Sequence, residues 1–478
     1  MSTMDVVHLR PSSRDDYAWF GDPVPFYFDG TYHLFYVWDQ GHLLLPRVCH
    51  AWGHFASKDL VHWQEYPLAI EPLEEASCGS GSIVWRDGVF HAFYLGRYFT
   101  TTGIMYETLC HALSTDLVAW TKDANNPISA PDVRTYTVRD WRDGFPIWDE
   151  ERQQYVMLVT ASLRDVPQAV RGCIALLSSK DLERWQLEEP FWAPYIGSEI
   201  ECPDLFYWNG WWYLVFSGTF AHASGTLYRR SRSMYGPWET PAIDTFDGSL
   251  FYAGKTAGNA ERRMLFGWIG TRTGMRDNGS VQWGGHGLIR ELLQDEQGYL
   301  WVKYPKERLQ IGQDVAFGNV LATRGEFLQC EDSLEVCSRD GLSYALTEAP
   351  SNLLIRFTFK SSEHVDQFGI VLCTDEGLST GYWVGIRPDE SRMFIRPIGK
   401  NAIGGAPTLS RPIVVAPDDS YRLTVIVSDS IIEVFVNDRT SLVGRYYGTG
   451  GCHIAWFSEN GCAMFSNISI RALPTDVW

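Results

Sequence analysis

The chain has 478 residues, of which 45% are apolar and 21% charged, and its formal net charge at pH 7 is −18. This length exceeds one ordinary domain and suffices for two. The negative charge argues against nucleic acid and against an anionic membrane as partners, and no apolar run approaches the length of a membrane span.

Aromatic residues make up 14% of the chain and include 20 tryptophans. Tryptophan at polar positions is typical of surfaces that stack on sugar rings, although it is also a core residue. The ten cysteines are scattered without a C-x-x-C pair, which favours reduced thiols over a metal site. Residues 1–14 contain no apolar leader segment, so we expect a cytoplasmic protein; a secreted protein whose leader had been removed would look the same.

The stretch 19–36 predicts a β-hairpin with a carboxylate near its start. Asp29-Gly30 separates two alternating apolar runs, which is the strongest short-range hairpin signal. Asp22 directly precedes Pro23 and is therefore expected in the first turn of a strand, near the end of a sheet. There it either faces a substrate or caps a turn, and this residue alone does not decide between the two roles.

A pattern in two parts recurs along the first two thirds of the chain. Its first part, a turn between two aromatic-rich strands, occupies residues 28–36, 85–94, 148–159, 207–216 and, more weakly, 254–268. Its second part is a closing turn of the form Ser-x-Asp-Leu-x-x-Trp, at residues 57–63, 114–120 and 179–185 and more loosely at 231–238. The closing tryptophans recur about every 50 to 65 residues, and each unit holds about four short strands, as in propeller blades. The sequence therefore predicts a five-bladed β-propeller over residues 1–308, in which Asp59, Asp116 and Asp181 stabilise the closing turns.

The pattern ends before a predicted linker at residues 309–325. From residue 326 to 478 the chain consists of short alternating strands with a turn about every ten residues, which predicts a β-sandwich. The whole fold is thus expected to be all-β. This second domain shows no catalytic constellation, and it is a possible surface for forming a homo-oligomer.

Three carboxylates occupy equivalent places in the repeat. Asp22, Asp143 and Glu201 each lie at the first strand of a unit, and the first strands of a propeller line its central cavity. Converging carboxylates suit glycoside hydrolysis, in which one attacks the anomeric carbon or activates water and a protonated one serves the leaving oxygen. Acids that merely start strands, or a Ca²⁺ site, would give the same pattern. Glu199 is a rival acid, because it lies on the same strand face as Glu201.

The motifs around these carboxylates resemble those of glycoside hydrolase family 32, the β-fructofuranosidase, inulinase and levanase family. Residues 19–23 are similar to its W-M-N-D-P motif, residues 142–144 to R-D-P, and residues 201–203 to its E-C motif. The resemblance implies that Asp22 is the nucleophile, that Glu201 is the general acid/base, and that Asp143 binds sugar hydroxyls and stabilises the transition state. It implies no metal and no organic cofactor.

Further segments of the chain carry the same resemblance. Residues 52–54, 79–82, 251–253, 267–268 and 422–437 are similar to family segments in the propeller and the sandwich. Trp52, Tyr252 and Trp268 are expected to wall the pocket, and Arg142 to help hold the ring hydroxyls. The full set of expected substrate-binding residues is Trp19, Trp38, Asp39, Gln40, Trp52, Ser80, Arg142, Tyr252 and Trp268.

Four positions depart from the family pattern. Gly21 replaces the Asn of W-M-N-D-P, Val37 a sugar-binding Gln, Gly79 a Phe and Gly144 a Pro. Losing the two amides removes polar recognition of the terminal sugar, which can matter strongly for specificity. Gly21 and Gly79 are also expected to widen the site. Trp38, Asp39, Gln40 and His42 are candidates for replacing the lost contacts.

The resemblance favours a retaining glycoside hydrolase that acts by double displacement on a furanoside. A β-fructofuranoside fits best, such as a fructan, a sucrose-like glycoside or a related oligosaccharide. Three alternatives remain open at this point. One is a fructosyltransferase or fructose-dianhydride activity on the same scaffold, another an inverting arabinofuranosidase- or xylosidase-like enzyme, and the third a propeller that binds sugar without cutting it.

Overall fold

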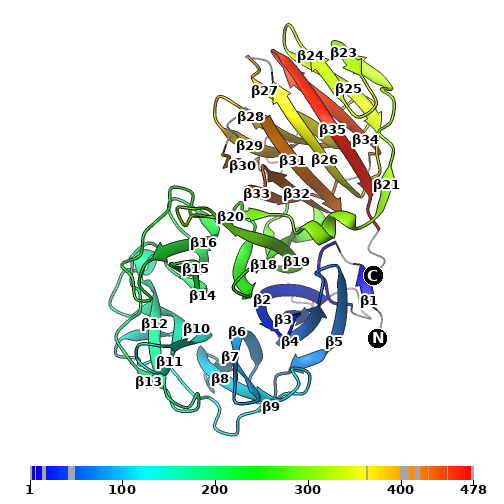
Figure 1. The fold of residues 1–478 in the computed structure, drawn as a ribbon. Helices are drawn as coiled ribbons and strands as arrows, with labels where there is room; N and C mark the ends of the chain where they lie inside the picture. The colour runs from blue at the N-terminus through cyan, green and yellow to red at the C-terminus, as the bar shows by residue number, and fades with distance from the viewer. Residues whose placement is uncertain are drawn as a thin grey trace.

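The computed structural model describes residues 3–5, 7–12, 18–40, 49–361, 364–398, 408–414, 420–428, 430–448 and 451–474. Within these ranges the chain consists of β-strands and three short 3-10 helices, η1 (Gln168–Val170), η2 (Thr273–Met275) and η3 (Lys306–Gln310). None of these helices has the length and apolar character needed to cross a membrane. Figure 1 shows two bodies, a ring of sheets from the first two thirds of the chain and a pair of packed sheets from the rest.

The ring is built from antiparallel sets of consecutive strands. The first set is β1 (Thr3–Asp5), β2 (Ala18–Phe28), β3 (Thr31–Gln40), β4 (His50–Ser57) and β5 (His62–Ile70). The next is β6 (Ser77–Arg86), β7 (Val89–Phe99), β8 (Met105–Ser114) and β9 (Thr121–Lys122), followed by β10 (Tyr136–Asp149), β11 (Gln154–Leu163), β12 (Gly172–Ser179) and β13 (Gln186–Leu187). Then come β14 (Glu201–Trp208), β15 (Trp211–Thr219) and β16 (Ser224–Ser231), and finally β17 (Tyr252–Gly258), β18 (Arg263–Arg272), β19 (Val281–Gln294) and β20 (Leu300–Lys303).

The two ends of the ring are joined in one nine-stranded sheet. Its order is β1-β5-β4-β3-β2-β19-β18-β17, with β20 also paired to β19. The joint between β2 and β19 is the pair Phe20–Gly285, and nearby the backbones of Leu9 and Gly287 exchange two hydrogen bonds of 3.0 and 2.7 Å. The first and last sets of the ring are therefore held together by backbone pairing.

The first strands of the sets meet at the centre of the ring. β2 contacts β6, β6 contacts β10, β10 contacts β14, β14 contacts β17, and β17 returns to β2. Each of these strands has a pairing irregularity, in the middle of β10 and near the start of the others, at Gly21/Pro23, Cys78/Gly81, Arg142/Phe145, Glu201/Asp204 and Tyr252/Lys255. Such bulges re-aim side chains, so the same place in every set presents residues to the shared centre.

The closing turns have the structural role that the repeat predicts. Oδ1 of Asp59 accepts backbone hydrogen bonds from Val61 and His62 at 2.9 and 2.8 Å, and the Trp63 indole donates to the Leu60 carbonyl at 3.1 Å. Asp116 and Asp181 make the equivalent bonds in the next two sets. These aspartates are thus occupied by their own turns.

The second body is a sandwich of two antiparallel sheets. One has the order β23-β24-β35-β26-β31-β32-β33 with β21 on β35, and the other the order β22-β25-β34-β27-β28-β29-β30. Their core is shared, since Ile355 and Val425 of the first sheet pack in one cluster with Ile370 and Trp456 of the second. The predicted all-β chain, a ring followed by a sandwich, is confirmed.

The strands of the sandwich begin earlier than the predicted boundary. They are β21 (Gln313–Val315), β22 (Ala322–Arg324), β23 (Glu326–Gln329), β24 (Leu334–Cys337), β25 (Leu342–Glu348), β26 (Leu353–Ser361), β27 (Gln367–Thr374), β28 (Tyr382–Arg387), β29 (Arg392–Pro397), β30 (Leu409–Pro412), β31 (Ser420–Ser428), β32 (Ile431–Val436), β33 (Thr440–Arg445), β34 (His453–Glu459) and β35 (Cys462–Ala472). β21 and β22 lie inside the stretch predicted as a linker, and they pair with β35 and β25.

One expectation about the cysteines is wrong. Cys337 and Cys462 form a disulfide, with their Cα atoms 4.1 Å apart. They face each other because β24 and β35 pair in a register that puts these two residues opposite one another. The other cysteines in the part of the chain that the structure describes are free thiols, as expected.

A buried ionic cluster joins the ring to the sandwich. Arg290 of β19 is fully buried and binds Asp247 at 3.1 Å and Glu433 of β32 by its other guanidinium nitrogen. His8 lies 2.8 Å from the second oxygen of Glu433. Burial alone would raise the pKa of Glu433, but Arg290 and then His8 lower it to about 2. We call His8, Asp247, Arg290 and Glu433 the junction cluster.

Candidate functional site

A cavity of about 470 Å³ lies where the first strands of the ring meet. Asp22, Asp143 and Glu201 all line it, so the fold brings together the three carboxylates that the repeat places at equivalent positions. They come from β2, β10 and β14, each at or beside the bulge of its strand. Their catalytic roles stay a prediction, but their common location is a fact of the fold.

Asp22 is a partly buried carboxyl with one direct hydrogen bond from a side chain. The Trp268 indole N–H donates to its Oδ1 at 3.0 Å. Burial, followed by the charges of Asp143 and Glu201, raises the pKa of Asp22 to about 7, against a smaller opposite effect of Lys255. The site therefore holds Asp22 near the balance between its protonated and ionised forms at neutral pH.

Asp143 is fixed from two sides and is almost fully buried. Its Oδ2 accepts hydrogen bonds from the Thr160 hydroxyl and from the Cys202 backbone N–H, both at 3.0 Å. Asp143 and Cys202 both have left-handed backbone angles, with φ of 57° and 53°. Local strain of this kind is characteristic of functional positions, because the surrounding structure must hold it in place.

Glu201 is the first residue of β14 and is held by two donors. Arg142 donates to its Oε1 at 2.9 Å, and the Tyr252 hydroxyl donates to its Oε2. Glu199 lies 3.5 Å from the same guanidinium nitrogen of Arg142, and burial together with Glu201 raises the pKa of Glu199. Glu201 makes the closer contacts, which agrees with the preference for it over Glu199.

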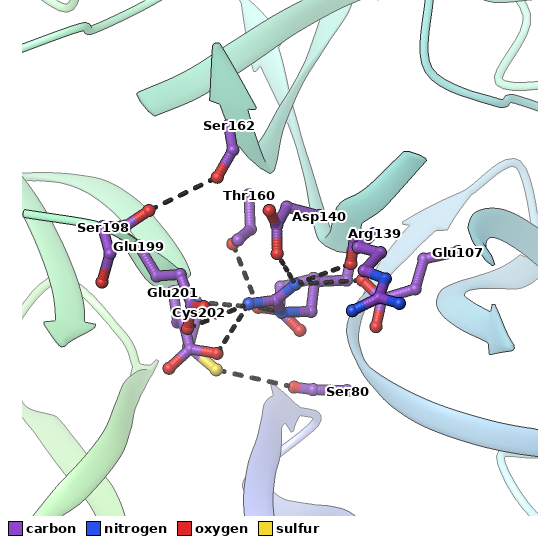
Figure 2. A network of polar contacts seen from close by, with 12 residues as sticks. Ser80, Glu107, Arg139, Asp140, Thr160, Ser162, Ser198, Glu199, Glu201 and Cys202 are labelled. Carbon is purple, nitrogen blue, oxygen red and sulfur yellow. Dashed lines mark hydrogen bonds and ion pairs between the residues drawn. The ribbon is translucent and has the colours of Figure 1, made fainter. Parts of the chain in front are cut away.

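Arg142 contacts several carboxylates, of which Glu107, Asp140, Glu199 and Glu201 are labelled in the polar network of Figure 2. Besides Glu201 it contacts Glu107 and Asp140, each at 3.0 Å, and it lies within 3.9 Å of Asp143. We call Arg142 and its carboxylate neighbours the site network; these neighbours are Glu107, Asp140, Asp143, Glu199 and Glu201. Arg97 and Arg171 extend it by pairing with Glu107 at 3.1 Å and with Asp140 at 3.4 Å.

Ser80 and Tyr252 line the cavity, whereas Trp268 is not among its lining residues and is connected to it by its hydrogen bond to Asp22. Beneath Ser80 lies Lys255, a buried lysine that donates to the Ser80 hydroxyl at 3.1 Å and to the Gly81 carbonyl at 2.6 Å. Lys255 thus supplies a positive charge below the carboxylates.

Other predicted binding residues do not line the cavity. Trp52 is fully buried in a hydrophobic cluster, where its indole donates to the Gly79 carbonyl at 2.7 Å. Trp19 is buried under the Arg10 guanidinium, and Trp38 packs against a second cluster. Asp39 is fully buried, 3.4 Å from His50. The Gln40 side chain and His42 lie outside the described residues.

The expectation that Gly21 and Gly79 widen the site is wrong. A Cβ built on Gly21 would lie 2.2 Å from Cη2 of Trp283, and one built on Gly79 would lie 2.5 Å from a methyl carbon of Leu95. Larger side chains from other strands therefore occupy the space that these glycines leave. The two glycines allow close approach of Trp283 and Leu95 rather than an open pocket.

Half of the residues that line the cavity were not predicted from the sequence. The lining residues that the sequence did not single out for binding are His50, Leu95, Arg97, Met105, Glu107, Arg139, Asp140, Gln168, Arg171 and Trp283. Most of them lie on second or later strands, or on loops, that carry no motif. One signal was present in the sequence: a glycine at position 21, in place of the family's Asn, leaves room that a large side chain from another strand can fill.

The described residues contain one grouping of possible metal ligands. It is Glu335 with Cys337 and Cys462, whose two sulfurs are bonded to each other. This grouping lies in the sandwich, apart from the cavity. The prediction that the chemistry needs no metal and no organic cofactor is not tested by this finding.

Similarity to known proteins agrees with the geometry of the site. The chain is 24% identical over 416 residues to the β-fructofuranosidase, insoluble isoenzyme 2, of Daucus carota, which is 79% of this chain and 66% of that protein. It is 29% identical over 269 residues to the sucrose-6-phosphate hydrolase of Klebsiella pneumoniae, 51% of this chain and 54% of that one. The chain thus spans less than two thirds of either relative.

Among solved structures, the exo-inulinase of Aspergillus awamori is similar in fold. The TM-score is 0.74 with 19% sequence identity, and the match covers 98% of each chain. The N-terminal domain of the glycosyl hydrolases family 32 matches residues 8–305, and the C-terminal domain of the same family matches residues 323–472. These two matches cover both the ring and the sandwich, and the chain belongs to glycosyl hydrolases family 32.

Proposed function

We propose that this chain is a retaining glycoside hydrolase that acts on β-fructofuranosides. The observation that carries the proposal is the convergence of Asp22, Asp143 and Glu201 on one cavity, with Glu201 held by Arg142 and Tyr252. Two carboxyls that flank one site can divide the roles of nucleophile and general acid. The relatives of this chain include a β-fructofuranosidase and a sucrose-6-phosphate hydrolase, which supports a fructosyl substrate.

In the first step the ionised Asp22 attacks the anomeric carbon, and the bond to the leaving oxygen breaks. Glu201 gives its proton to that oxygen, and a covalent glycosyl ester forms on Asp22. Arg142 and Tyr252 hold Glu201 in place for this transfer. Their hydrogen bonds also stabilise the carboxylate that remains on Glu201 after it has lost the proton.

In the second step water attacks the anomeric carbon, and Glu201 takes up the proton that the water loses. The bond to Asp22 breaks, and the free sugar leaves with its original anomeric configuration. Asp143 is suited to accept hydrogen bonds from the ring hydroxyls, because Thr160 and the Cys202 backbone fix the direction of its carboxylate. Such positioning contributes by holding the sugar close to the attacking oxygen.

We also infer that the ring is a five-bladed propeller that ends near residue 308. The cycle of contacts through β2, β6, β10, β14 and β17 supports one blade for each first strand. The nine-stranded sheet then contains the first and the last blade, which are joined where β2 meets β19 and by the backbone bonds between Leu9 and Gly287. A central cavity at the inner strands is the usual place for a propeller site.

Product analysis tests the function. Sucrose, inulin, levan, fructose dianhydrides and aryl fructo- and arabinofuranosides are incubated with the protein and with Glu201→Gln, and the anomer of the first product is followed by NMR. We expect fructose to be released with retention, and this release to be lost in the variant. Release of arabinose with inversion would instead favour the inverting alternative. Fructosyl oligomers in place of free fructose would show transfer, and no turnover would favour a sugar-binding protein.

A further inference from the structure

The side of the cavity next to Asp22 is formed by an indole ring. Trp283 of β19 lies against the backbone of Gly21, the residue before Asp22, so closely that no Cβ fits between them. The ring of Trp283 stacks on His50 with centroids 4.3 Å apart and an interplanar angle of 22°. Trp268, which donates to Asp22, lies 5.3 Å from Trp283 on another side.

The backbone around Trp283 holds this ring in place. Gly284, the next residue, has φ of 82°, and a Cβ there would lie 2.9 Å from the Cβ of Trp19. The pair Gly285–Phe20 then ties β19 to the strand that carries Asp22. The position of the indole relative to the carboxyl is therefore set by backbone pairing and by contact on several sides.

Besides His50, whose imidazole lies 3.4 Å from Asp39, two apolar side chains line the cavity near Gly21 and Gly79. Val37 pairs with Gly21 across β2 and β3, and Leu95 fills the space over Gly79. Both line the cavity, and neither side chain can form a hydrogen bond. Arg142, Asp143 and Glu201 line the same cavity and supply polar groups that can bind sugar hydroxyls.

The geometry points to Trp283 as the residue that sets substrate specificity beside Asp22. This inference rests on the proposed glycosidase activity and adds to it. The indole stacks on the C–H face of the donor sugar, and the wall selects donors that present few hydroxyls to it, such as deoxy or anhydro sugars. A hydroxyl buried there would lose its hydrogen bonds to water without replacement, which is unfavourable.

The test compares kcat/KM for an aryl β-fructofuranoside with kcat/KM for its monodeoxy analogues. In Trp283→Leu we expect the ratio to shift toward the fully hydroxylated substrate by about 10- to 200-fold, the range for contacts in an apolar pocket. Trp148→Leu is the matched control, because that indole is exposed on a hairpin of β10 and β11 and lies outside the cavity lining. Its ratio should equal that of the unmodified protein.

A second arm tests the contact between Gly21 and Trp283 directly. Gly21→Ala forces the two residues apart and should lower kcat/KM at least about tenfold, and Trp283→Leu in the same chain should recover most of that loss. Thermal melting of every variant shows whether it folds, and Trp283→Phe replaces Trp283→Leu if the latter does not.

The outcomes separate the two ideas. An unchanged substrate ratio in Trp283→Leu, together with no recovery in the double variant, would overturn the role of Trp283 while the hydrolase activity stands. No turnover of any glycoside by the unmodified protein would overturn the proposed function and this inference with it.

Discussion

The site network and the junction cluster are each built around one arginine, but the pKa values of two nearby carboxyls, Asp22 and Glu433, shift in opposite directions. At the junction, Arg290 and His8 are close to two carboxylates, Asp247 and Glu433, and the pKa of Glu433 falls to about 2. In the cavity, five carboxylates surround Arg142, and the pKa of the nearby Asp22 rises to about 7.

The difference lies in the balance of charge rather than in burial. Arg290 is matched by its partners, and Asp247 also accepts backbone hydrogen bonds from Gly248 at 2.6 Å and Val443 at 2.8 Å. The site network has more negative charge than its arginines and Lys255 neutralise, and the charges of Asp143 and Glu201 add to burial in raising the pKa of Asp22. A cluster whose charges cancel keeps its carboxylates ionised, whereas an excess of negative charge raises the pKa of a nearby carboxyl such as Asp22.

The largest expected effect comes from removing a carboxylate from the cavity. Glu201→Gln keeps the shape of the side chain but cannot donate or accept the catalytic proton. We expect kcat to fall by about 10²- to 10⁴-fold, the usual contribution of a general acid–base group. The melting temperature should not decrease, because the substitution relieves repulsion in the network. A variant that stays active would assign the acid role elsewhere, with Glu199 as the first candidate.

Breaking the junction cluster should lower the stability of the fold and leave the activity unchanged. Arg290→Met leaves Asp247 and Glu433 buried without their cation, which costs about 3–5 kcal/mol of unfolding free energy in comparable buried pairs. Urea unfolding measures this loss, and kcat/KM per folded molecule should remain that of the unmodified protein. Arg134→Met is the control, because its side chain is 88% exposed and its change should stay within about 0.5 kcal/mol. Equal stabilities for the two variants would contradict the comparison.

Asp22 itself should destabilise the fold at alkaline pH. Its pKa rises from an ordinary 3.8 to about 7 in the folded chain, so the folded state binds more protons than the unfolded state between these values. The contribution of Asp22 to the unfolding free energy is fully present below pH 4 and is lost as the pH rises through 7. Asp22→Asn should therefore raise the unfolding free energy at pH 8 by about 4 kcal/mol, with no gain at pH 4. Urea unfolding at both pH values measures this, and a gain at pH 4 would point to another cause.

The smallest expected effect concerns Lys255, the buried lysine that donates to the Ser80 hydroxyl. Asp22 must be ionised to attack, so kcat/KM should rise with pH through about 7. Lys255 lowers the pKa of Asp22, and Lys255→Met should therefore move this rise to higher pH. Lys122→Met is the control, since Lys122 pairs with Glu75 outside the cavity lining. The pH profile of kcat/KM is the measurement, and a shift to lower pH would contradict this electrostatic account.

The repeat made much of the ring predictable. The Asp-Gly turns and the closing turns recur at regular spacing, so the units could be counted and the carboxylates aligned without knowing any contact. Asp22, Asp143 and Glu201 meet because each occupies the same place near the bulge of a first strand. The local motifs and the regular repeat were sufficient to predict that these three carboxylates lie together.

The apolar wall and the junction could not be predicted in the same way. Trp283 meets Gly21 only through pairing between strands that are far apart in sequence, and nothing local to either residue specifies the other. Glu433 did carry a signal, since a carboxylate inside the apolar run 431–436 requires a buried cation. The sequence does not say that Arg290 supplies it. The Cys337–Cys462 bond likewise depends on the register between β24 and β35.

The joint between Phe20 and Gly285 has a consequence for how the protein becomes active. Trp283 and Asp22 belong to opposite ends of the ring and come together only when this joint forms. A chain emerging from the ribosome must therefore complete its last set of strands before Trp283 can reach Asp22, the proposed nucleophile, and such long-range pairing is a late step in folding. Catalytic turnover therefore reports that the ring has closed, and a truncated or misfolded chain should have no activity.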